Sequence, residues 1–230
     1  MFGSFIKRAA QADHQLPRIN ENLVDIGGDL NVPSLLAGYR SGAFPWTVNP
    51  VTWWSPDPRA VIEFDTFHPP RSLLKFLRKE PFLVTIDRAF EQVIRQCATS
   101  APTRRTTWIT PEFIRAYTEL HKAGHAHSLE VWREGQLVGG IYGVSIGGYF
   151  AGESMFHRVS NASKAALFFL GRHLAARHYA LFDIQMPTRV TVQMGATLVA
   201  RRDFIQRLRE AQRLPVTFGE ELEVRVETGR

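Results

Sequence analysis

The hydrophobic positions along the chain change their period several times, and each change predicts a new secondary-structure element. After residue 128, apolar residues alternate with small or polar ones in three successive segments, recur at helical spacing, and then form one more short run. This order predicts three antiparallel strands, a helix and a returning strand. We expect helices over residues 31–41, 71–79, 88–97, 110–120, 163–178 and 201–213, and strands over 60–64, 82–86, 128–133, 137–145, 149–155, 179–185 and 197–200.

This mixture of elements predicts the α+β fold class. Three strands, a helix and a returning strand are the order of an N-acetyltransferase core, so we expect an N-acetyltransferase-like catalytic domain over residues 101–230. A polar stretch with a proline at 99–106 predicts the boundary. Residues 1–100 are expected to form a smaller α+β domain that begins with a loose arm over 1–20. Its Trp/Pro-rich stretch, which contains Trp46, is expected to form rigid loops because proline fixes φ and lacks an N–H donor.

The composition excludes several classes of protein. Of the 230 residues, 44% are hydrophobic and 11% aromatic, which is typical of a globular chain and excludes a mainly disordered one. Cys97 is the single cysteine, so a disulfide framework and a cysteine-rich zinc site are excluded. The longest apolar stretches, such as 165–170, are far shorter than the ~18–20 residues of a membrane-spanning helix. Residues 1–10 lack the apolar run of a signal peptide, so we expect a cytoplasmic protein with no membrane partner.

The charge pattern favours a polyanionic partner. The net charge is +6, and 23 arginines stand against 5 lysines. The planar arginine fork binds phosphate with two hydrogen bonds and stacks on bases, although a basic surface can also serve solubility alone. Within the predicted helix over 71–79, four cations share one face at helical spacing: Arg71, Lys75, Arg78 and Lys79.

Two polar insertions in predicted strands are candidate chemical groups. Asp183 and Gln185 point to one face of a strand that is otherwise apolar, and a buried carboxylate there needs partners. Glu153 follows Gly152 near the end of a second strand, where a glycine permits close approach of a ligand. Taken by themselves, both insertions also have a structural interpretation, as a satisfied aspartate or a strand-end bulge. No spacing typical of a metal site, a P-loop or a phosphate-binding GxGxxG turn is present, so we expect neither a metal nor a cofactor such as CoA.

Several short segments together resemble the leucyl/phenylalanyl-tRNA–protein transferase family. The resemblance implies an enzyme that moves Leu or Phe from aminoacyl-tRNA to the α-amine of proteins with N-terminal Arg or Lys. Because an apolar pocket discriminates only modestly between side chains of similar size, we expect it to accept Met as well. The product is an N-degron that an adaptor delivers to an ATP-dependent protease, and no cofactor or metal takes part. The matching segments are residues 35–46, 53–60, 67–73, 107–110, 124–128, 152–156, 160–164 and 183–186.

The resemblance also implies roles for individual residues. Asp183 and Gln185 match the proposed catalytic pair, in which Gln185 orients the amine and Asp183 draws its proton. Glu153 matches a glutamate near the aminoacyl ester and the acceptor. The helix with Arg71, Lys75, Arg78 and Lys79 matches a region that faces the tRNA acceptor stem. The other expected substrate-binding residues are Trp46 and Trp108 around the terminal adenosine, Phe150, Gly152, Leu170 and Phe182 in the apolar side-chain pocket, and Tyr39 in the first matching segment.

The chain departs from the family pattern at two places. Ile184 stands where the family usually has Cys, at a position expected to face away from the catalytic pair. Residues 187–194 lack a histidine that usually follows Met186, which leaves the range of acceptors open. Two alternative functions also remain open at this point. A CoA-dependent N-acyltransferase shares the order of elements, and a non-catalytic RNA-binding protein shares the tryptophans and the basic helices.

Overall fold

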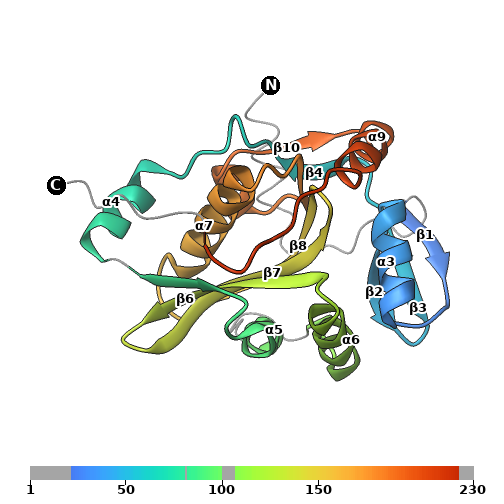
Figure 1. Ribbon diagram of the computed structural model, residues 1–230, viewed down its shortest axis with the longest axis horizontal. Coiled ribbons are helices and arrows are strands. Elements are labelled where there is room, and N and C mark those ends of the chain that lie inside the picture. Colours follow the sequence, from blue (N-terminus) through green and yellow to red (C-terminus); the bar gives the residue numbers. More distant parts are fainter. Residues whose placement is uncertain (1–21, 81, 100–106, 223–230) are drawn as a thin grey trace.

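The computed structural model describes residues 22–80, 82–99 and 107–222, and a seven-stranded sheet forms its centre. The strands are β4 (Arg59–Ile62), β5 (Leu83–Ile86), β6 (Ala126–Arg133), β7 (Gln136–Ile146), β8 (Tyr149–His157), β9 (Leu181–Gln185) and β10 (Ala196–Val199). They lie in the order β10-β4-β9-β8-β7-β6-β5, with β8 and β9 parallel and the other neighbours antiparallel (Figure 1).

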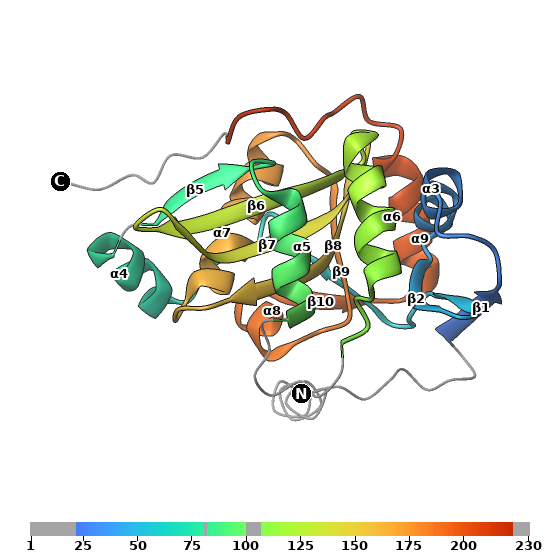
Figure 2. The same ribbon diagram turned by 90° about the horizontal axis from the view of Figure 1, so that it is seen from below.

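Helices cover both faces of this sheet (Figures 1 and 2). Helix α7 (Ala162–Ala176) packs on one face, and α5 (Phe90–Thr99) and α6 (Pro111–Lys122) pack on the other. The sheet thereby separates two hydrophobic clusters, one containing Leu170 of α7 and one containing Tyr117 of α6. The observed order β6, β7, β8, α7, β9 agrees with the predicted three strands, helix and returning strand.

A second, three-stranded sheet lies beside the large one. It consists of β1 (Leu23–Ile26), β3 (Val51–Trp54) and β2 (Phe44–Val48), in that spatial order. Helix α3 (Val32–Ser41) connects β1 to β2 along the chain. The predicted start and end of α3 are confirmed. The Asn31 side chain accepts a hydrogen bond from the Ser34 N–H at 2.9 Å, and Gly42 ends the helix with a left-handed φ of 87°.

The prediction of rigid loops around the tryptophans is wrong. Trp46 lies on β2, and Trp53 and Trp54 lie on β3, which pairs with both β1 and β2. The prolines did not prevent strand formation because Pro45 lies on β2, an edge strand, where a missing N–H donor is tolerated.

The predicted division at residues 100 and 101 does not coincide with a division between the sheets. Strands β4 and β5 precede residue 100, yet both belong to the seven-stranded sheet. The two sheets meet along the chain between Trp54 and Arg59 instead. The polar stretch that suggested the boundary lies almost entirely in 100–106, outside the described residues, as does the expected arm over 1–20.

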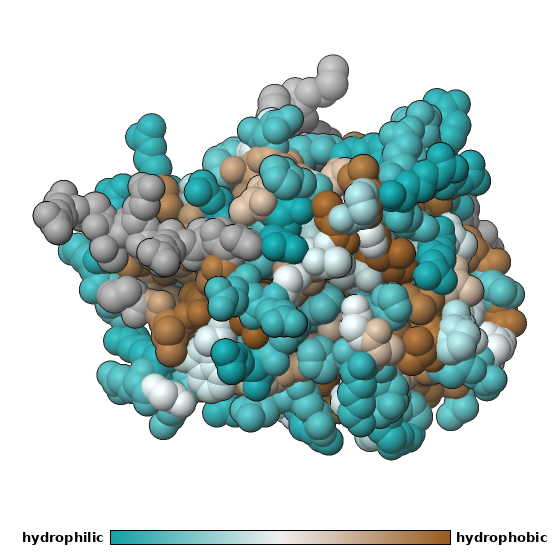
Figure 3. Space-filling view, viewed as in Figure 1, coloured by the Kyte–Doolittle hydropathy of each residue, from teal (hydrophilic) through white to brown (hydrophobic). Residues whose placement is uncertain are grey.

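Three further helices complete the described chain. Helix α4 (Arg71–Lys79) has the predicted bounds and packs against α7 through Leu73 and Leu77. Helix α9 (Arg201–Ala211) packs near α3 and β9. The short α8 (Arg189–Gln193) was not predicted, and it begins with a capping box formed by Thr188. Most of the face shown in Figure 3 is hydrophilic, with smaller hydrophobic patches between the polar residues.

The pairing of β8 and β9 is short, and this positions the candidate site. The two strands pair at Tyr149 with Leu181, at Phe150 with Phe182 and at Ala151 with Asp183, and no pairing follows within the described register. Glu153 and Gln185 therefore lie beyond the last paired residues, and their side chains are hydrogen-bonded to each other.

Candidate active site

Asp183 on β9 is fully buried. Its Oδ1 accepts hydrogen bonds from Arg59 Nε at 2.9 Å and from the Gln185 backbone N–H at 2.8 Å. Its Oδ2 accepts from Arg59 Nη2 at 2.7 Å and from the Tyr149 hydroxyl at 2.8 Å. Both oxygens are therefore engaged, which satisfies the requirement that a buried carboxylate be paired.

Arg59 is the partner that sequence reasoning missed. It stands at the start of β4, is fully buried, and places its guanidinium 5.1 Å from the Phe44 ring centroid and 4.5 Å from that of Phe204. Burial lowers the pKa of Arg59, but the Asp183 carboxylate outweighs burial and leaves the pKa above its usual value. The arginine is consequently charged, and the pair is a buried ion pair. A signal was present in the sequence: an arginine opens the otherwise apolar run Arg59–Ile62.

Gln185 connects the buried Arg59–Asp183 pair to Glu153. Its backbone adopts a left-handed φ of 60°, which is costly for a residue other than glycine, by roughly 1–3 kcal/mol. The bond from its N–H to Asp183 offsets part of this cost. Its side-chain Nε2 donates to Glu153 Oε1 at 2.7 Å. The structure thus brings together the three polar residues that the sequence singled out.

Glu153 is half-buried on β8 and is the group of this site that titrates near neutral pH. Burial raises its pKa to about 7; a hydrogen bond from Tyr39 lowers the pKa, and the Asp183 charge raises it. The Tyr117 hydroxyl donates to Glu153 Oε2 at 3.3 Å, and the hydroxyls of Tyr39 and Tyr117 are hydrogen-bonded to each other. Tyr39 was predicted as a site residue, whereas Tyr117 was not.

An aromatic row leads from this polar group toward the three-stranded sheet. Trp46 and Trp108 stack with centroids 5.7 Å apart and planes 14° apart, and both are half-buried. Phe113 contacts Trp108 edge-on at 5.2 Å and lies 6.2 Å from Tyr117. The two predicted tryptophans therefore lie together, linked through Phe113 to the tyrosine that binds Glu153.

The predicted apolar pocket residues lie together on the opposite face of the sheet, toward α7. Phe150 and Phe182 are in edge contact at 5.8 Å, and Leu170 belongs to the same cluster. A Cβ on Gly152 would lie 3.4 Å from Phe182 Cε2. Gly152 is the first residue of β8 after its pairing with β9 ends, and it lies between Phe150 of the apolar cluster and Glu153 of the polar site along the strand.

The basic helix lies apart from these groups. Arg71, Lys75, Arg78 and Lys79 are exposed on α4, as predicted. Figures 1 and 2 show α4 at the end of the molecule opposite α3, the helix that contributes Tyr39. A ligand that contacts both must therefore extend along much of the molecule.

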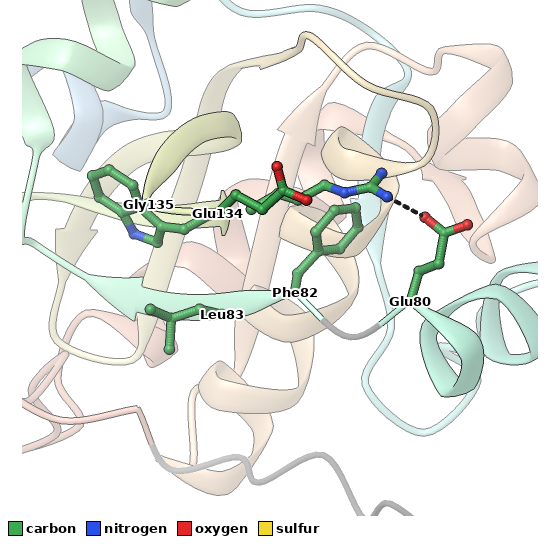
Figure 4. Close-up of a pocket in the computed structure, with 7 residues that line it drawn as sticks. Glu80, Phe82, Leu83, Glu134 and Gly135 are labelled. Atoms are coloured by element: carbon green, nitrogen blue, oxygen red, sulfur yellow. Dashed lines mark ion pairs between the residues drawn. The ribbon is translucent and has the colours of Figure 1, made fainter.

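Two surface hollows lie elsewhere and include none of the predicted site residues. One, of about 330 Å³, lies at the edge strand β5 and is lined by Phe82, Leu83 and Trp132, with Glu80 paired to Arg133 at 3.0 Å (Figure 4). The other, of about 480 Å³, lies between α5 and α6. Within the described ranges, no helix is long and apolar enough to cross a membrane, and no three His, Cys, Asp or Glu residues are grouped to hold a metal ion.

A carboxylate with a pKa raised by burial and hydrogen-bonded to a buried polar network is a feature typical of enzyme active sites. The family model described as leucyl/phenylalanyl-tRNA protein transferase matches residues 61–209, and the model of its N-terminal domain matches 28–57. The chain therefore belongs to the leucyl/phenylalanyl-tRNA–protein transferase family of aminoacyltransferases.

Relatives with that description match along most of the chain. The protein of Chromohalobacter salexigens is 49% identical over 89% of this chain and 80% of its own length. That of Syntrophotalea carbinolica is 49% identical over 90% of both chains, and that of Nitratidesulfovibrio vulgaris is 46% identical over 86% of both. Among solved structures, L-PGS from Bacillus licheniformis gives a TM-score of 0.43 at 15% identity, covering 66% of this chain and 56% of that one, a likeness too weak to support any statement about this chain.

Proposed function

We propose that the protein transfers Leu or Phe from aminoacyl-tRNA to the α-amine of proteins with N-terminal Arg or Lys, and that it also accepts Met as a secondary substrate. The observation that carries this proposal is the hydrogen bond between Gln185 and Glu153. It joins the polar residues of β9 and β8 into one site, in a chain that belongs to the transferase family. In the reaction, the amine nitrogen forms a bond to the aminoacyl carbonyl carbon. The ester C–O bond breaks, and the ribose hydroxyl of the tRNA leaves with a proton.

The chemical demand on the protein is moderate. The ester is already activated, and an α-amine with a pKa of about 7.7–8.0 is partly neutral at pH 7. The protein must align the two substrates and accept one proton from the attacking amine. Glu153 is suited to the second task because its pKa of about 7 lies near that of the amine and because it is only half-buried.

Asp183 is better suited to positioning than to proton transfer. The sequence suggested that Asp183 draws the amine proton through Gln185. Its two oxygens already accept four hydrogen bonds, two of them from a charged arginine, and its side chain is fully buried. We therefore assign Asp183 to holding Gln185, and Gln185 to orienting the amine beside Glu153.

The remaining predicted residues are assigned to the tRNA and its amino acid. The Trp46–Trp108 pair is proposed to stack with the terminal adenosine, since unpaired bases bind aromatic side chains. Phe150, Gly152, Leu170 and Phe182 are proposed to receive the Leu or Phe side chain. The four cations of α4 are proposed to bind backbone phosphates of the acceptor stem.

The wider assignments follow from the same family resemblance. We assign the reaction to an N-acetyltransferase-like catalytic domain over 101–230, supported by the order β6, β7, β8, α7, β9, with Arg59 contributed by the part of the chain before it. The products are proposed to be N-degrons for an adaptor and an ATP-dependent protease. The proposed site of action is the cytoplasm, because charged tRNA is found there.

A transfer assay tests the proposal directly. Labelled leucine on tRNA is mixed with peptides that differ only in their first residue, and we expect labelled product with Arg and Lys and little with Ala or Asp. Absence of transfer to every peptide would contradict the proposal. If tRNA nonetheless binds, the non-catalytic RNA-binding alternative is favoured, and thermal stabilisation by acetyl-CoA would favour the N-acyltransferase alternative.

A further inference from the structure

The space beside Gly152 has three neighbours, and one of them is the side chain of Ile184. A Cβ placed on Gly152 would lie 3.4 Å from Phe182 Cε2, 3.6 Å from the Asp183 carbonyl oxygen and 3.9 Å from Ile184 Cγ2. These are ordinary contact distances, so one added carbon at Gly152 would touch all three neighbours without a clash. Gly152 lies where β8 and β9 stop pairing, between the polar residues and the apolar cluster on the α7 face.

Burial separates Ile184 from the other apolar residues there. Phe150 and Phe182 are 0% exposed and Leu170 is 1% exposed, so their side chains are already enclosed by the core. Ile184 is half-buried and packs against the same cluster from its edge, as Met155 also does. Of the apolar residues beside Gly152, Ile184 is therefore the one with a partly exposed side chain that a ligand can contact without displacing the core.

The backbone fixes the position of this side chain. Asp183, the preceding residue, is held by Arg59 and Tyr149, and Gln185, the following residue, is held through its N–H and its side chain. The Met186 N–H bonds back to the Ile184 carbonyl at 2.7 Å. Isoleucine is also β-branched and stiff at χ1. With both neighbours anchored, Ile184 has little freedom to move away from an oversized ligand.

We infer that Ile184 limits the size of the amino-acid side chain that the enzyme transfers, and so sets its preference between leucine and phenylalanine. This inference rests on the proposed function and adds a specificity-determining residue to it. The sequence had suggested that this position merely packs away from the catalytic pair. Its side chain does point away from Asp183 and Gln185, but that direction is toward the predicted apolar pocket.

The test compares the two substrates within one enzyme preparation. The kcat/KM for transfer from Phe-tRNA is divided by that from Leu-tRNA, a ratio that a loss of folded protein does not change. We expect Ile184→Ala and Ile184→Cys to raise the ratio roughly tenfold, since about one methylene in a hydrophobic pocket has an effect of this size or more. Ile184→Phe should lower it. Ile184→Val removes one methylene and is the mildest change, so it should raise the ratio by a smaller factor and can be measured if the other variants fold poorly.

Val84→Ala is the matched control. Val84 is also half-buried against this cluster, but it lies on the edge strand β5, four strands away from β9 in the sheet. Its ratio should equal that of the wild type. Ratios within twofold of wild type in Ile184→Ala and Ile184→Phe, in enzymes that still transfer leucine, overturn the role of Ile184 and leave the proposed function intact. A wild-type protein that transfers neither amino acid overturns both.

Discussion

Arg59 binds both carboxylate oxygens of Asp183, at 2.9 and 2.7 Å, across 124 residues of sequence. The pair is fully buried and joins β4 to β9 at the point where Asp183 also accepts the Gln185 N–H. A buried ion pair is weak support for stability by itself, because desolvation opposes the attraction. Its consequence here is positional, since it fixes the backbone on which the Gln185 side chain reaches Glu153.

Removal of the Asp183 carboxylate is therefore expected to damage both activity and stability. Asp183→Ala and Asp183→Asn should lower turnover roughly a hundredfold, the effect of a misplaced reacting group. They should also lower the free energy of unfolding by about 3–5 kcal/mol, because Arg59 is left charged and unpaired. Single-turnover transfer and urea unfolding measure the two effects, while binding of aminoacyl-tRNA should persist.

The double variant Arg59→Met with Asp183→Leu separates the two effects. An apolar replacement of both partners should recover much of the stability but not the activity. Unchanged turnover in the single variants would contradict a role for Asp183, and recovery of turnover in the double variant would contradict the positional role.

The pKa of Glu153 predicts a pH dependence of transfer. A proton acceptor must be ionised, so with a pKa of about 7 its active fraction rises about tenfold between pH 6 and pH 8. The acceptor α-amine also becomes neutral in this range and adds a second rise near its own pKa of about 7.7–8.0. In Glu153→Gln, kcat/KM should fall by roughly 10²-fold, and only the rise from the amine should remain. An identical two-step profile in the variant would exclude Glu153 as the acceptor.

The same shift predicts that Glu153 destabilises the fold at alkaline pH. Its pKa is raised from 4.5 in the unfolded chain to about 7, so the folded protein binds this proton more tightly. This tighter binding contributes about 3 kcal/mol to the free energy of unfolding. The contribution is fully present below pH 4.5 and is lost as the pH rises through 7. Glu153→Gln, which stays neutral, should unfold at higher urea than wild type at pH 8 and at similar urea at pH 4. A difference that does not change with pH would contradict this account.

Local patterns in the sequence predicted the helices and the antiparallel strands because their causes are local. Asn31 and Gly42 mark the ends of α3, and the spacing of the cations defines one exposed face of α4. The tryptophan segment was misread because proline is compatible with an edge strand, and neighbours in a sheet decide which strand is at the edge. The large sheet likewise takes in β4 and β5, which no local composition indicates.

The candidate site was predictable in part for the same reason. Alternation along β9 placed Asp183 and Gln185 on one face, and the family segments marked Glu153, Tyr39 and the tryptophans. The pairing of Asp183 with Arg59 depends on two strands that come together only in the folded chain. Tyr117 lies at helical spacing from other apolar residues, so its hydroxyl could not be assigned to Glu153 from the pattern.

The exposed cations of α4 predict a steep salt dependence of tRNA use. Each phosphate contact releases counterions, so each lost contact should reduce the slope of log(1/KM) against log[salt] by about one at most. The double variant Lys75→Gln with Arg78→Gln should therefore show a flatter slope and a nearly unchanged kcat. The measurement is the KM for aminoacyl-tRNA over a range from low to moderate salt. The control is Arg202→Gln on α9, an exposed arginine at the other end of the molecule. Equal slopes in the α4 and α9 variants would place the tRNA elsewhere.

The contacts of Phe218 predict that the segment after α9 stabilises the seven-stranded sheet. Its ring is 2% exposed and stacks on His127 at 4.3 Å and on Phe150 at 5.7 Å, and its carbonyl is hydrogen-bonded to His173 at 2.8 Å. Phe218→Ala leaves a cavity against all three and should lower the free energy of unfolding by about 3–5 kcal/mol. Leu214→Ala, at a 38% exposed leucine of the same segment, should cost much less. Equal losses in the two variants would mean that Phe218 has no special part in holding the segment to β8.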